Sequence, residues 1–435
     1  MKRETVSFSL ENISVEKLIG WVNKFDVFTF FNSNPSANNP PDLYSNFDYL
    51  LAIGAHFTYD NNSNPFNDLK VAESSNDWHI VNLSYDLKNN LEDLHSNNSD
   101  FLGFAQQRLY IPEIVFEIKS ENVAVHFFPD KFSLEQIKLM IEEINSFNKN
   151  ELHEFNKIYS CSIRQKISKE KYISSVENIK DHIQRGDIYE MNFCQEFYSE
   201  ECIIHPPTIY QKLNDLSPMP FSVFSKHKSE YIICASPERY LAKRDDQIIS
   251  QPIKGTARRG ENDFEDKKIA QNLFNDPKER SENVMIVDLV RNDLSRTALK
   301  GSVSVQELFG IKTYQQLHQM VSTITSRIES STAFSDVIAT TFPMGSMTGA
   351  PKIRAMQLIE ELEDTKRGMY SGSIGYLAPN GHADFNVVIR SILYNQEKKY
   401  LSFIVGSAIT IGSVAEKEYE ECLLKASAMI QVLKK

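Results

Sequence analysis

The chain has 435 residues, of which 41% are hydrophobic and 24% charged, and its 47 basic and 58 acidic residues give a net charge of −11. This composition is typical of a folded globular protein with a large core, and the negative charge disfavours a general nucleic-acid or anionic-membrane binder. No apolar run approaches the roughly 18 residues of a membrane span, and the N-terminus lacks a signal-type apolar segment. We therefore expect a soluble, cytoplasmic protein without nucleic-acid or membrane partners.

The cysteines are scattered along the chain and form no Cys-x-x-Cys motif; they are Cys161, Cys194, Cys202, Cys234 and Cys422. An odd, scattered set indicates neither a zinc cluster nor a disulfide framework. We expect reduced thiols.

The first 150 residues contain short apolar runs separated by connectors rich in Asn, Ser and Pro, which is typical of short strands and loops. Helical spacing of apolar residues predicts a helix over Leu134–Phe147, with Ser133 as its N-cap. The charged stretch Asn148–Glu154 then indicates a boundary between an N-terminal region, residues 1–150, and a second region, residues 160–435. The N-terminal region contains no recognisable chemical motif.

The second region is denser in predicted elements. Asp276 as N-cap and Pro277 as the first helical residue predict the start of a helix. Apolar periodicity predicts helices over Ser168–Gln184 and Ala415–Leu433, and strands over Tyr231–Ala235, Gln247–Ile253, Met320–Ile328, Asn386–Leu393 and Tyr400–Thr410. Strands and helices do not alternate regularly, so the sequence favours an α+β fold over a doubly wound sheet.

Two pairs of glutamates are spaced three residues apart on predicted helices: Glu279 with Glu282, and Glu418 with Glu421. Residues at this spacing share a helix face, so each pair can direct two carboxylates at one point. Oxygen donors from two helices suit Mg²⁺. Solvated surface glutamates are the alternative for any such pair. Glu282 differs from a typical surface glutamate, because it lies one turn before an apolar stripe. A carboxylate that faces a core needs a counter-charge.

A glycine-rich segment, Gly345–Lys352, leads into a predicted helix with Pro351 at its first position. Exposed N–H groups at such a helix start can bind a carboxylate or a phosphate. The glycine spacing differs from that of a Walker A loop, which disfavours ATP and GTP as ligands. An ordinary helix-initiating turn is the alternative.

Four single side chains are further candidates. Lys254 ends an apolar strand before a Gly-Thr turn, where partial desolvation would lower its pKa and make it a nucleophile; a lysine that extends to solvent is the alternative. Arg390 ends an apolar run and needs an anion if it faces the interior. Glu238, at a strand end, suits a general acid or an ordinary salt bridge. His318 is by default a core or surface histidine.

Several strings occur together in one order: Ser236–Arg239, Pro252–Thr256, Glu282–Asp293, Gly345–Lys352 and Glu418–Lys425. The residues of these strings and their order along the chain resemble those of the chorismate-binding enzymes, a family that includes anthranilate, aminodeoxychorismate, isochorismate and salicylate synthases. The resemblance extends from about residue 173 to residue 429 and is loose in the N-terminal region. It implies a large α+β fold with two packed β-sheets flanked by helices, in which residues 1–150 complete the fold and residues 160–435 form the catalytic region.

The resemblance also implies a cofactor and roles for the candidate residues. It implies Mg²⁺, bound by Glu282 and Glu421 with support from Glu279 and Glu418. The ring carboxylate of chorismate would be held by the metal, Lys425 and backbone N–H groups near Thr348 and Gly349, and the enolpyruvyl carboxylate by Arg390, Tyr370 and the Gly406 backbone. His318 would lie near the ring and its C4 hydroxyl, and Glu238 would be the general acid or base that helps that hydroxyl leave.

Three features distinguish members of this family by resemblance. Members that add water at C2 carry a lysine at the position of Glu190, ammonia-using members usually carry glutamine, and this departure leaves the role of Glu190 open. Anthranilate synthases typically have alanine at the position of Lys254, whereas aminodeoxychorismate synthases have lysine. The N-terminal region also lacks the Leu-Leu-Glu-Ser string that marks tryptophan feedback. These features favour the aminodeoxychorismate branch; anthranilate synthase component I and a non-catalytic binding paralogue are the alternatives.

The chemistry that this branch implies is covalent catalysis. Lys254 would add at C2 as the C4 hydroxyl leaves with a proton from Glu238, and ammonia would then enter at C4 and expel the lysine. The chain shows no recognisable glutaminase module with a Cys/His pair. We therefore expect ammonia from solution or from a separate glutamine amidotransferase subunit.

Overall fold

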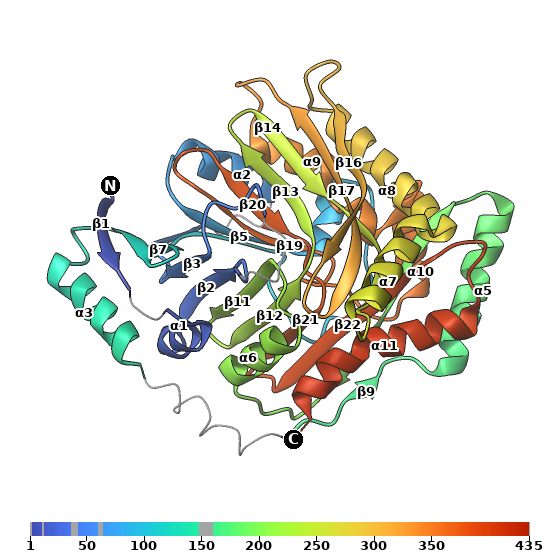
Figure 1. Cartoon of the computed structure of the whole chain (residues 1–435), viewed down its shortest axis with the longest axis horizontal. Coiled ribbons are helices and arrows are strands. Elements are labelled where there is room, and N and C mark those ends of the chain that lie inside the picture. Colours follow the sequence, from blue (N-terminus) through green and yellow to red (C-terminus); the bar gives the residue numbers. More distant parts are fainter. Residues whose placement is uncertain (1, 11–12, 36–41, 60–63, 148–159, 435) are drawn as a thin grey trace.

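Two antiparallel β-sheets form the centre of the molecule, and helices lie around them (Figure 1). The computed structural model describes residues 2–10, 13–35, 42–59, 64–147 and 160–434. Apolar side chains from both sheets, among them Leu50, Ile80 and Ile232, pack together in one buried cluster. The expectation of an α+β fold with two packed sheets flanked by helices is confirmed.

The first sheet combines strands from both ends of the chain. Its order is β1-β8-β7-β3-β2-β11-β12-β21-β22-β10-β18, and β9 pairs with β10. The strands are β1 (Glu4–Ser9), β2 (Val27–Asn32), β3 (Tyr49–Ile53), β7 (Ile114–Lys119), β8 (Asn122–Phe127), β9 (Arg164–Gln165), β10 (Glu190–Ser199), β11 (Phe221–His227), β12 (Glu230–Ser236), β18 (Gly349–Ala350), β21 (Ser391–Asn395) and β22 (Tyr400–Ile409). The pairing of β2 with β11 joins the N-terminal strands to the later ones.

The second sheet has the same mixed origin. Its order is β15-β17-β14-β13-β20-β19-β5-β6-β4, and β16 pairs with β17. The strands are β4 (Phe57–Tyr59), β5 (His79–Leu83), β6 (Gln107–Ile111), β13 (Arg239–Arg244), β14 (Gln247–Gln251), β15 (Ile253–Arg258), β16 (Ser304–Thr313), β17 (Leu317–Arg327), β19 (Ser373–Leu377) and β20 (Ala383–Asn386). The N-terminal region therefore contributes strands to both sheets. The boundary expected at Asn148–Glu154 lies outside the described residues.

The helices bury their apolar faces on the two sheets. They are α1 (Val15–Val22), α2 (Pro65–Ser74), α3 (Leu134–Ser146), α5 (Lys169–Arg185), α6 (Pro206–Leu216), α7 (Asp263–Asn275), α8 (Pro277–Ser295), α9 (Phe334–Thr341), α10 (Lys352–Leu362) and α11 (Ala415–Leu433), with 3-10 turns η1 (Tyr85–Asn90) and η3 (Gly345–Met347). Side chains of α1, α3, α5, α6, α10 and α11 pack in the core of the first sheet, and those of α2, α8 and α9 in the core of the second. No helix in the described ranges has the length and apolar character to cross a membrane.

Helix limits follow the capping signals closely. Ser133 and Gln136 form a reciprocal capping box on α3, and the Asp276 carboxylate accepts from two N–H groups at the start of α8.

Two strand expectations were wrong. The stretch Asn386–Leu393 is broken between β20 and β21, where Arg390 has a φ of 49°. The segment around Lys254 continues as β15 through a register shift at Ile253–Thr256, in place of a turn.

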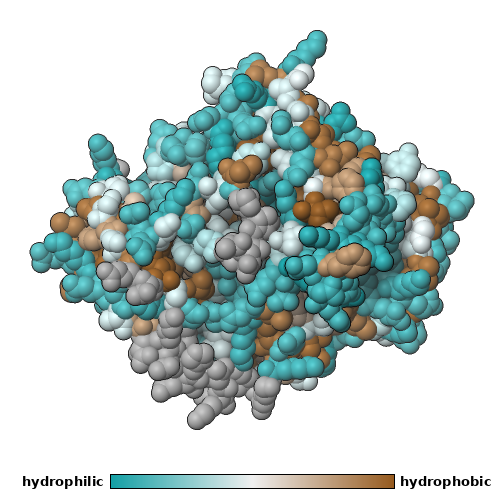
Figure 2. Space-filling model, viewed as in Figure 1, coloured by the Kyte–Doolittle hydropathy of each residue, from teal (hydrophilic) through white to brown (hydrophobic). Residues whose placement is uncertain are grey.

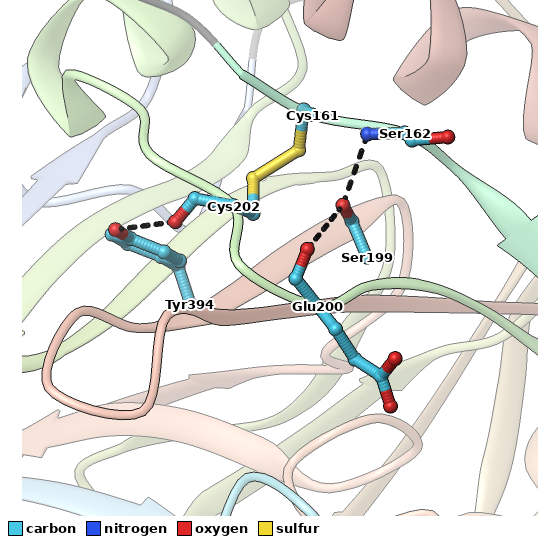
Figure 3. Close-up of a disulfide and its surroundings, with 6 residues drawn as sticks. All are labelled: Cys161, Ser162, Ser199, Glu200, Cys202 and Tyr394. Atoms are coloured by element: carbon cyan, nitrogen blue, oxygen red, sulfur yellow. Dashed lines mark hydrogen bonds between the residues drawn. A yellow bond between two sulfur atoms is a disulfide. The ribbon is translucent and has the colours of Figure 1, made fainter.

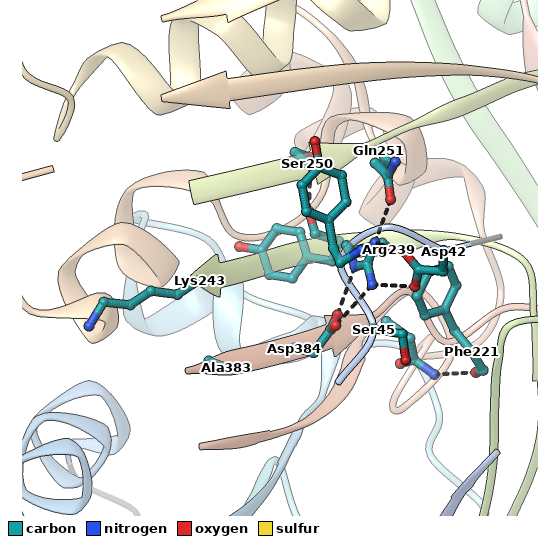
Figure 4. Close-up of polar contacts among 12 residues, drawn as sticks. Asp42, Ser45, Phe221, Arg239, Lys243, Ser250, Gln251, Ala383 and Asp384 are labelled. Carbon is teal, nitrogen blue, oxygen red and sulfur yellow. Dashed lines mark hydrogen bonds and ion pairs between the residues drawn. The ribbon is translucent and has the colours of Figure 1, made fainter. Parts of the chain in front are cut away.

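A buried arginine ties the second sheet to the N-terminal region (Figure 4). Arg239 of β13, 1% exposed, donates to the carboxylates of Asp42 and Asp384 and to Gln251. Burial alone would lower the pKa of Arg239, but the two aspartates outweigh it and raise that pKa. The network holds the backbone directly after Glu238, so it helps to position that candidate acid.

One disulfide contradicts the expectation of reduced thiols (Figure 3). Cys161 and Cys202 are bonded, although 41 residues separate them. A bridge between Ser160 and Ile203 brings the two chain segments side by side, and sequence spacing alone does not reveal such an approach. The other three cysteines are free and buried, as expected for small apolar core residues.

Candidate active site

The centre of the candidate site is a buried ion pair between the two sheets. Glu190 is the first residue of β10, near one end of the first sheet, and Lys254 lies on β15, an edge of the second. The Lys254 Nζ donates to Glu190 Oε1 at 2.7 Å, and the two side chains are 10% and 2% exposed. Two chain segments 64 residues apart thus meet through their charged groups.

The charge on Lys254 differs from the sequence expectation. Burial lowers its pKa, as expected, but the carboxylates of Glu190, Glu282 and Glu238 outweigh burial, and the net shift is upward. The expectation of a lowered pKa was therefore wrong, because three carboxylates lie close enough to outweigh desolvation. Lys254 is held as an ammonium ion and must lose a proton before it can attack carbon.

Glu238 is a buried carboxyl group beside this pair. It lies in the connection between β12 and β13 and is 4% exposed. Ser346 Oγ donates to Glu238 Oε1 at 2.7 Å. Burial raises the pKa of Glu238 to about 7, opposed by Ser346 and by Lys254. A carboxyl group with such a pKa can donate a proton near neutral pH, which suits a general acid.

The four glutamates expected to bind a metal surround one lysine. Lys278 Nζ lies 3.8 Å from Glu282 Oε1 and 4.0 Å from Glu418 Oε1. Burial lowers the pKa of Lys278, but Glu282, Glu418, Glu279 and Glu421 all raise it, and the net shift is upward. One glutamate of each helix therefore approaches the same ammonium, and its single positive charge offsets part of the negative charge of the four carboxylates.

The Glu282 carboxylate carries the clearest sign of an incomplete environment. Its Oε1 is buried without a hydrogen-bond partner among the described residues, and burial raises its pKa to about 7, together with repulsion from Glu190 and Glu279. No three acidic, histidine or cysteine side chains within the described ranges already stand as a metal-binding group. A metal bound there would compete with the Lys278 ammonium for Glu282 and Glu418. The all-oxygen donor set from two helices fits Mg²⁺.

Lys425 and Gly406 lie together beside the carboxylates. Lys425 Nζ is 2.8 Å from Glu421 Oε1 and donates to the Gly406 carbonyl at 3.0 Å. Burial raises the pKa of Glu421, but Lys425, together with Lys278 and Lys254, outweighs burial and the net shift is downward. A Cβ on Gly406 would lie 2.4 Å from the Cys194 sulfur, so only glycine fits this close approach between β22 and β10.

The Gly345–Lys352 segment leads into helix α10, as expected, with Pro351 one residue before the first helical position. It contains the turn η3 and the short strand β18, which pairs with β10, and Pro351 is the N-cap of α10. The Thr348 N–H donates to the Gly345 carbonyl at 3.2 Å. A Cβ on Gly349 would lie 2.2 Å from the Glu190 carbonyl oxygen. The segment therefore packs directly against Glu190 and also carries Ser346.

Arg390 is a cation without a counter-charge in the described part of the chain. Burial lowers the pKa of its guanidinium to about 10, although Tyr314 opposes the shift, and no described carboxylate forms a salt bridge with it. A desolvated guanidinium of this kind suits an anionic ligand. Tyr370, 5% exposed, lies near Cys194, with its hydroxyl 3.7 Å from the sulfur, and Cys194 in turn adjoins Gly406.

His318 forms its hydrogen bonds away from these groups. Its Nε2 lies 2.9 Å from Asp266 Oδ1, and its Nδ1 lies 2.9 Å from Thr313 Oγ1. Its position on β17 pairs with Ala257, three residues after Lys254 on β15. The structure thus shows a saturated, buried histidine near the site. Its role toward the ring of a substrate stays a prediction.

Sequence reasoning missed three contributors: Ser346, Lys278 and the pairing of Glu190. Lys278 precedes Glu282 by four residues, and this helical spacing was a usable signal. Ser346 lies inside a recognised segment, but its contact with Glu238 spans 108 residues. The Glu190–Lys254 contact likewise depends on how the two sheets meet.

A family model described as "chorismate binding enzyme" matches residues 42–431 of this chain. The chain belongs to this family. Aminodeoxychorismate synthase component 1 of Bacillus subtilis (strain 168) is 38% identical over 262 residues, which make up 60% of this chain and 55% of that protein. Anthranilate synthase component 1 of Aquifex aeolicus (strain VF5) is 36% identical over 270 residues, 62% of this chain and 54% of that protein. The matches thus span about half the length of these curated relatives, and both activities occur at equal similarity.

Solved structures support the same family. Anthranilate synthase component I from Streptococcus pneumoniae superimposes with a TM-score of 0.75 and 26% identity, covering 90% of this chain and 93% of that one. The menaquinone-specific isochorismate synthase of Escherichia coli gives a TM-score of 0.75 at 16% identity over 99% of this chain and 95% of that one. The second likeness shows a shared fold alone.

Proposed function

We propose that this chorismate-binding enzyme is component I of an aminodeoxychorismate synthase, which converts chorismate and ammonia to 4-amino-4-deoxychorismate for p-aminobenzoate and folate synthesis. The observation that carries the proposal is Lys254: a lysine, in place of a small residue, buried against Glu190 and near Glu238. A lysine there can form a covalent bond to the substrate and so divide one difficult displacement into two steps.

Mg²⁺ is the proposed cofactor. Glu282 and Glu421 would hold it, with Glu279 and Glu418 in support, because all four carboxylates raise the pKa of Lys278 and one from each helix approaches its ammonium. When bound, Mg²⁺ supplies positive charge that orients and polarises the ring carboxylate of chorismate. Lys425, beside Glu421 and the Gly406 carbonyl, would add a second positive charge on the same side.

The substrate's other groups are assigned to the remaining residues. Arg390 would bind the enolpyruvyl carboxylate, because its guanidinium is desolvated and has no described acidic partner. Tyr370 and the Gly406 backbone would line the same space, and backbone N–H groups near Thr348 and Gly349 would help to hold the ring carboxylate. Glu238 would donate a proton to the C4 hydroxyl as it leaves, which agrees with a pKa of about 7.

The ammonia is proposed to come from a separate glutamine amidotransferase subunit or, in its absence, from solution. The description "component 1" of relatives in Bacillus subtilis and Escherichia coli supports a separate partner. We expect the purified chain to use ammonium salts, with faster turnover at higher free NH₃, and to make no product from glutamine. Glutamine-dependent turnover by the single chain would contradict the proposed partner. A cytoplasmic location stays a prediction, and the Cys161–Cys202 disulfide is unusual for a reducing compartment.

The test is product identification from chorismate, Mg²⁺ and ammonium chloride. Aminodeoxychorismate keeps its enolpyruvyl group, so we expect a product in which an amino group replaces one hydroxyl of chorismate, without pyruvate release. Anthranilate synthase component I is the second candidate, because its relatives are equally similar. That activity would release pyruvate and give fluorescent anthranilate. Either of these two products in quantity would reject the aminodeoxychorismate assignment, and unchanged chorismate would favour a non-catalytic binding protein.

A further inference from the structure

We propose that Glu190 is a catalytic proton acceptor that takes a proton from Lys254 and returns it when the lysine is expelled. The inference rests on the proposed function, because it assigns the base that this covalent route requires. Its observations are geometric: a carboxylate in direct contact with the attacking nitrogen, buried with it, on a different sheet.

The position of Glu190 favours direct proton exchange. Its Oε1 lies 2.7 Å from Lys254 Nζ, which is hydrogen-bond distance, and the residue is 1% exposed. Its Oε2 is buried without a hydrogen-bond partner among the described residues. The β10–β18 pairing and the close approach of Gly349 to the Glu190 carbonyl hold the backbone in place. A carboxylate so placed can accept a proton without help from bulk water.

The other acids near Lys254 are less suited to this role. Three carboxylates raise the pKa of Lys254: Glu190 of β10, Glu282 of α8 and Glu238 of the β12–β13 connection. The charge of Lys254 in turn lowers the pKa values of Glu279 and of Glu421 on α11. Within the described ranges, Glu190 alone forms a hydrogen bond with Nζ. Glu238 accepts from Ser346 and must carry its own proton for the leaving hydroxyl. The carboxylates of α8 and α11 are assigned to Mg²⁺.

The proton balance closes over one turnover. Glu190 accepts a proton from the Lys254 ammonium, and the free amine forms a bond to C2 while the ring double bonds shift and the C4–O bond breaks. The hydroxyl leaves as water with the proton of Glu238, and the adduct nitrogen keeps two hydrogens and a positive charge. Ammonia then bonds to C4, the double bonds shift back, and the C2–N bond breaks to release a neutral lysine. That lysine recovers the proton held by Glu190, and the new C4 ammonium returns one to Glu238.

Glu190→Gln is the direct test, because it keeps the size of the side chain and removes the base. The readout is the rate at which the covalent adduct forms on Lys254 with chorismate and Mg²⁺ and without ammonia, followed by intact mass. We expect the rate near pH 7 to fall by about 100-fold or more, the usual range for loss of a general base, while chorismate binding is retained. The control is Glu196→Gln, a second buried glutamate on β10 whose carboxylate contacts Tyr400 and Ser402; it should form adduct at the wild-type rate.

The pH profile separates proton transfer from a structural role. The wild type needs protonated Glu238 and an internal proton exchange, so adduct formation should be level below pH 7 and fall above it, since the pKa of Glu238 is about 7. In Glu190→Gln the lysine must lose its proton to solvent, so the rate should rise toward pH 7. Glu190→Asp should retain the wild-type profile at a reduced rate, and it serves as a second test should the glutamine variant fold poorly.

Two results would overturn the inference: adduct formation by Glu190→Gln at the wild-type rate, or a reduced rate with the wild-type pH profile. A wild-type enzyme that forms no adduct on Lys254 would instead reject the proposed function itself. The failures of the two proposals are thereby distinguishable.

Discussion

Two neighbouring charged regions of this site balance their charges in different ways. In the carboxylate region of α8 and α11, four glutamates face the ammonium of Lys278, a side chain that is 54% exposed and attached to the protein surface by a flexible stem. In the lysine region, Lys254 and Glu190 are 10% and 2% exposed and in direct contact. The cation of the first region is half-exposed and lies 3.8–4.0 Å from the carboxylates, whereas the ions of the second are buried and in direct contact. The contrast favours a metal at the first and proton exchange at the second.

The largest effect is expected when a carboxylate of the α8 and α11 region is removed. We expect Glu282→Gln and Glu421→Gln each to abolish Mg²⁺-dependent turnover while the protein stays folded, because each removes a charged donor. The measurement is turnover against Mg²⁺ concentration, with Glu420→Gln, an exposed change on α11, as the matched control. Full activity of either variant at limiting Mg²⁺ would refute the metal assignment.

Glu282→Gln should also change stability in a pH-dependent way. Burial raises the folded pKa of Glu282 to about 7, so the protonated form stabilises the fold at low pH and ionisation costs stability as the pH rises from about 4.5 to 7. Without Mg²⁺, the glutamine variant should gain on the order of 2–3 kcal/mol at pH 8 relative to wild type, and little at pH 4. Thermal unfolding at both pH values measures this.

The buried Lys254–Glu190 pair should respond differently to loss of its lysine. Lys254→Ala should remove the covalent adduct and reduce aminodeoxychorismate formation by at least about a thousandfold, as for loss of other covalent nucleophiles. It also leaves Glu190 buried without a partner, so we expect a loss of about 3–5 kcal/mol in the free energy of unfolding. Intact mass with ammonia withheld, and chemical denaturation, are the two measurements. Wild-type synthesis by this variant would show that Lys254 is not the nucleophile, and residual ammonia addition at C2 would appear as anthranilate.

A milder test varies the pH. Because burial raises the pKa of Glu238 to about 7, the group loses its proton as the pH rises through that value. Adduct formation should then fall about tenfold per pH unit above 7, as expected when one acidic group must be protonated. The measurement omits ammonia, since free NH₃ rises with pH and would mask the decline. Glu238→Gln should remove this limb of the profile along with most of the rate.

The sequence predicted the local features of this molecule well and its long-range contacts poorly. The caps of α3 and α8 depend on residues within one turn of each other, and the apolar repeat of α11 lies within that one helix, so these features could be read directly. Each glutamate pair was accessible for the same reason, because its spacing lies within one helix, whereas the approach of α8 to α11 is a long-range contact that only the family resemblance implied. The Glu190–Lys254 pair joins two sheets across 64 residues, and the disulfide spans 41. No local periodicity carries such contacts. The upward shift in the pKa of Lys254 depends on such long-range contacts, so the sequence did not predict it.

The smallest predicted effect concerns Lys278, the cation of the α8 and α11 region. If its ammonium occupies the charge that Mg²⁺ replaces, Lys278→Ala should tighten metal binding, since the ion no longer competes with a tethered cation. The gain should be about fivefold in the Mg²⁺ concentration for half-maximal turnover, because ion pairs of half-exposed lysines contribute only about 1 kcal/mol. Without Mg²⁺ the same variant should be less stable, since four glutamates lose a neutralising charge. Lys417→Ala, an exposed lysine on α11, is the control, and weaker Mg²⁺ binding by Lys278→Ala would show that Lys278 supports the site and does not compete for it.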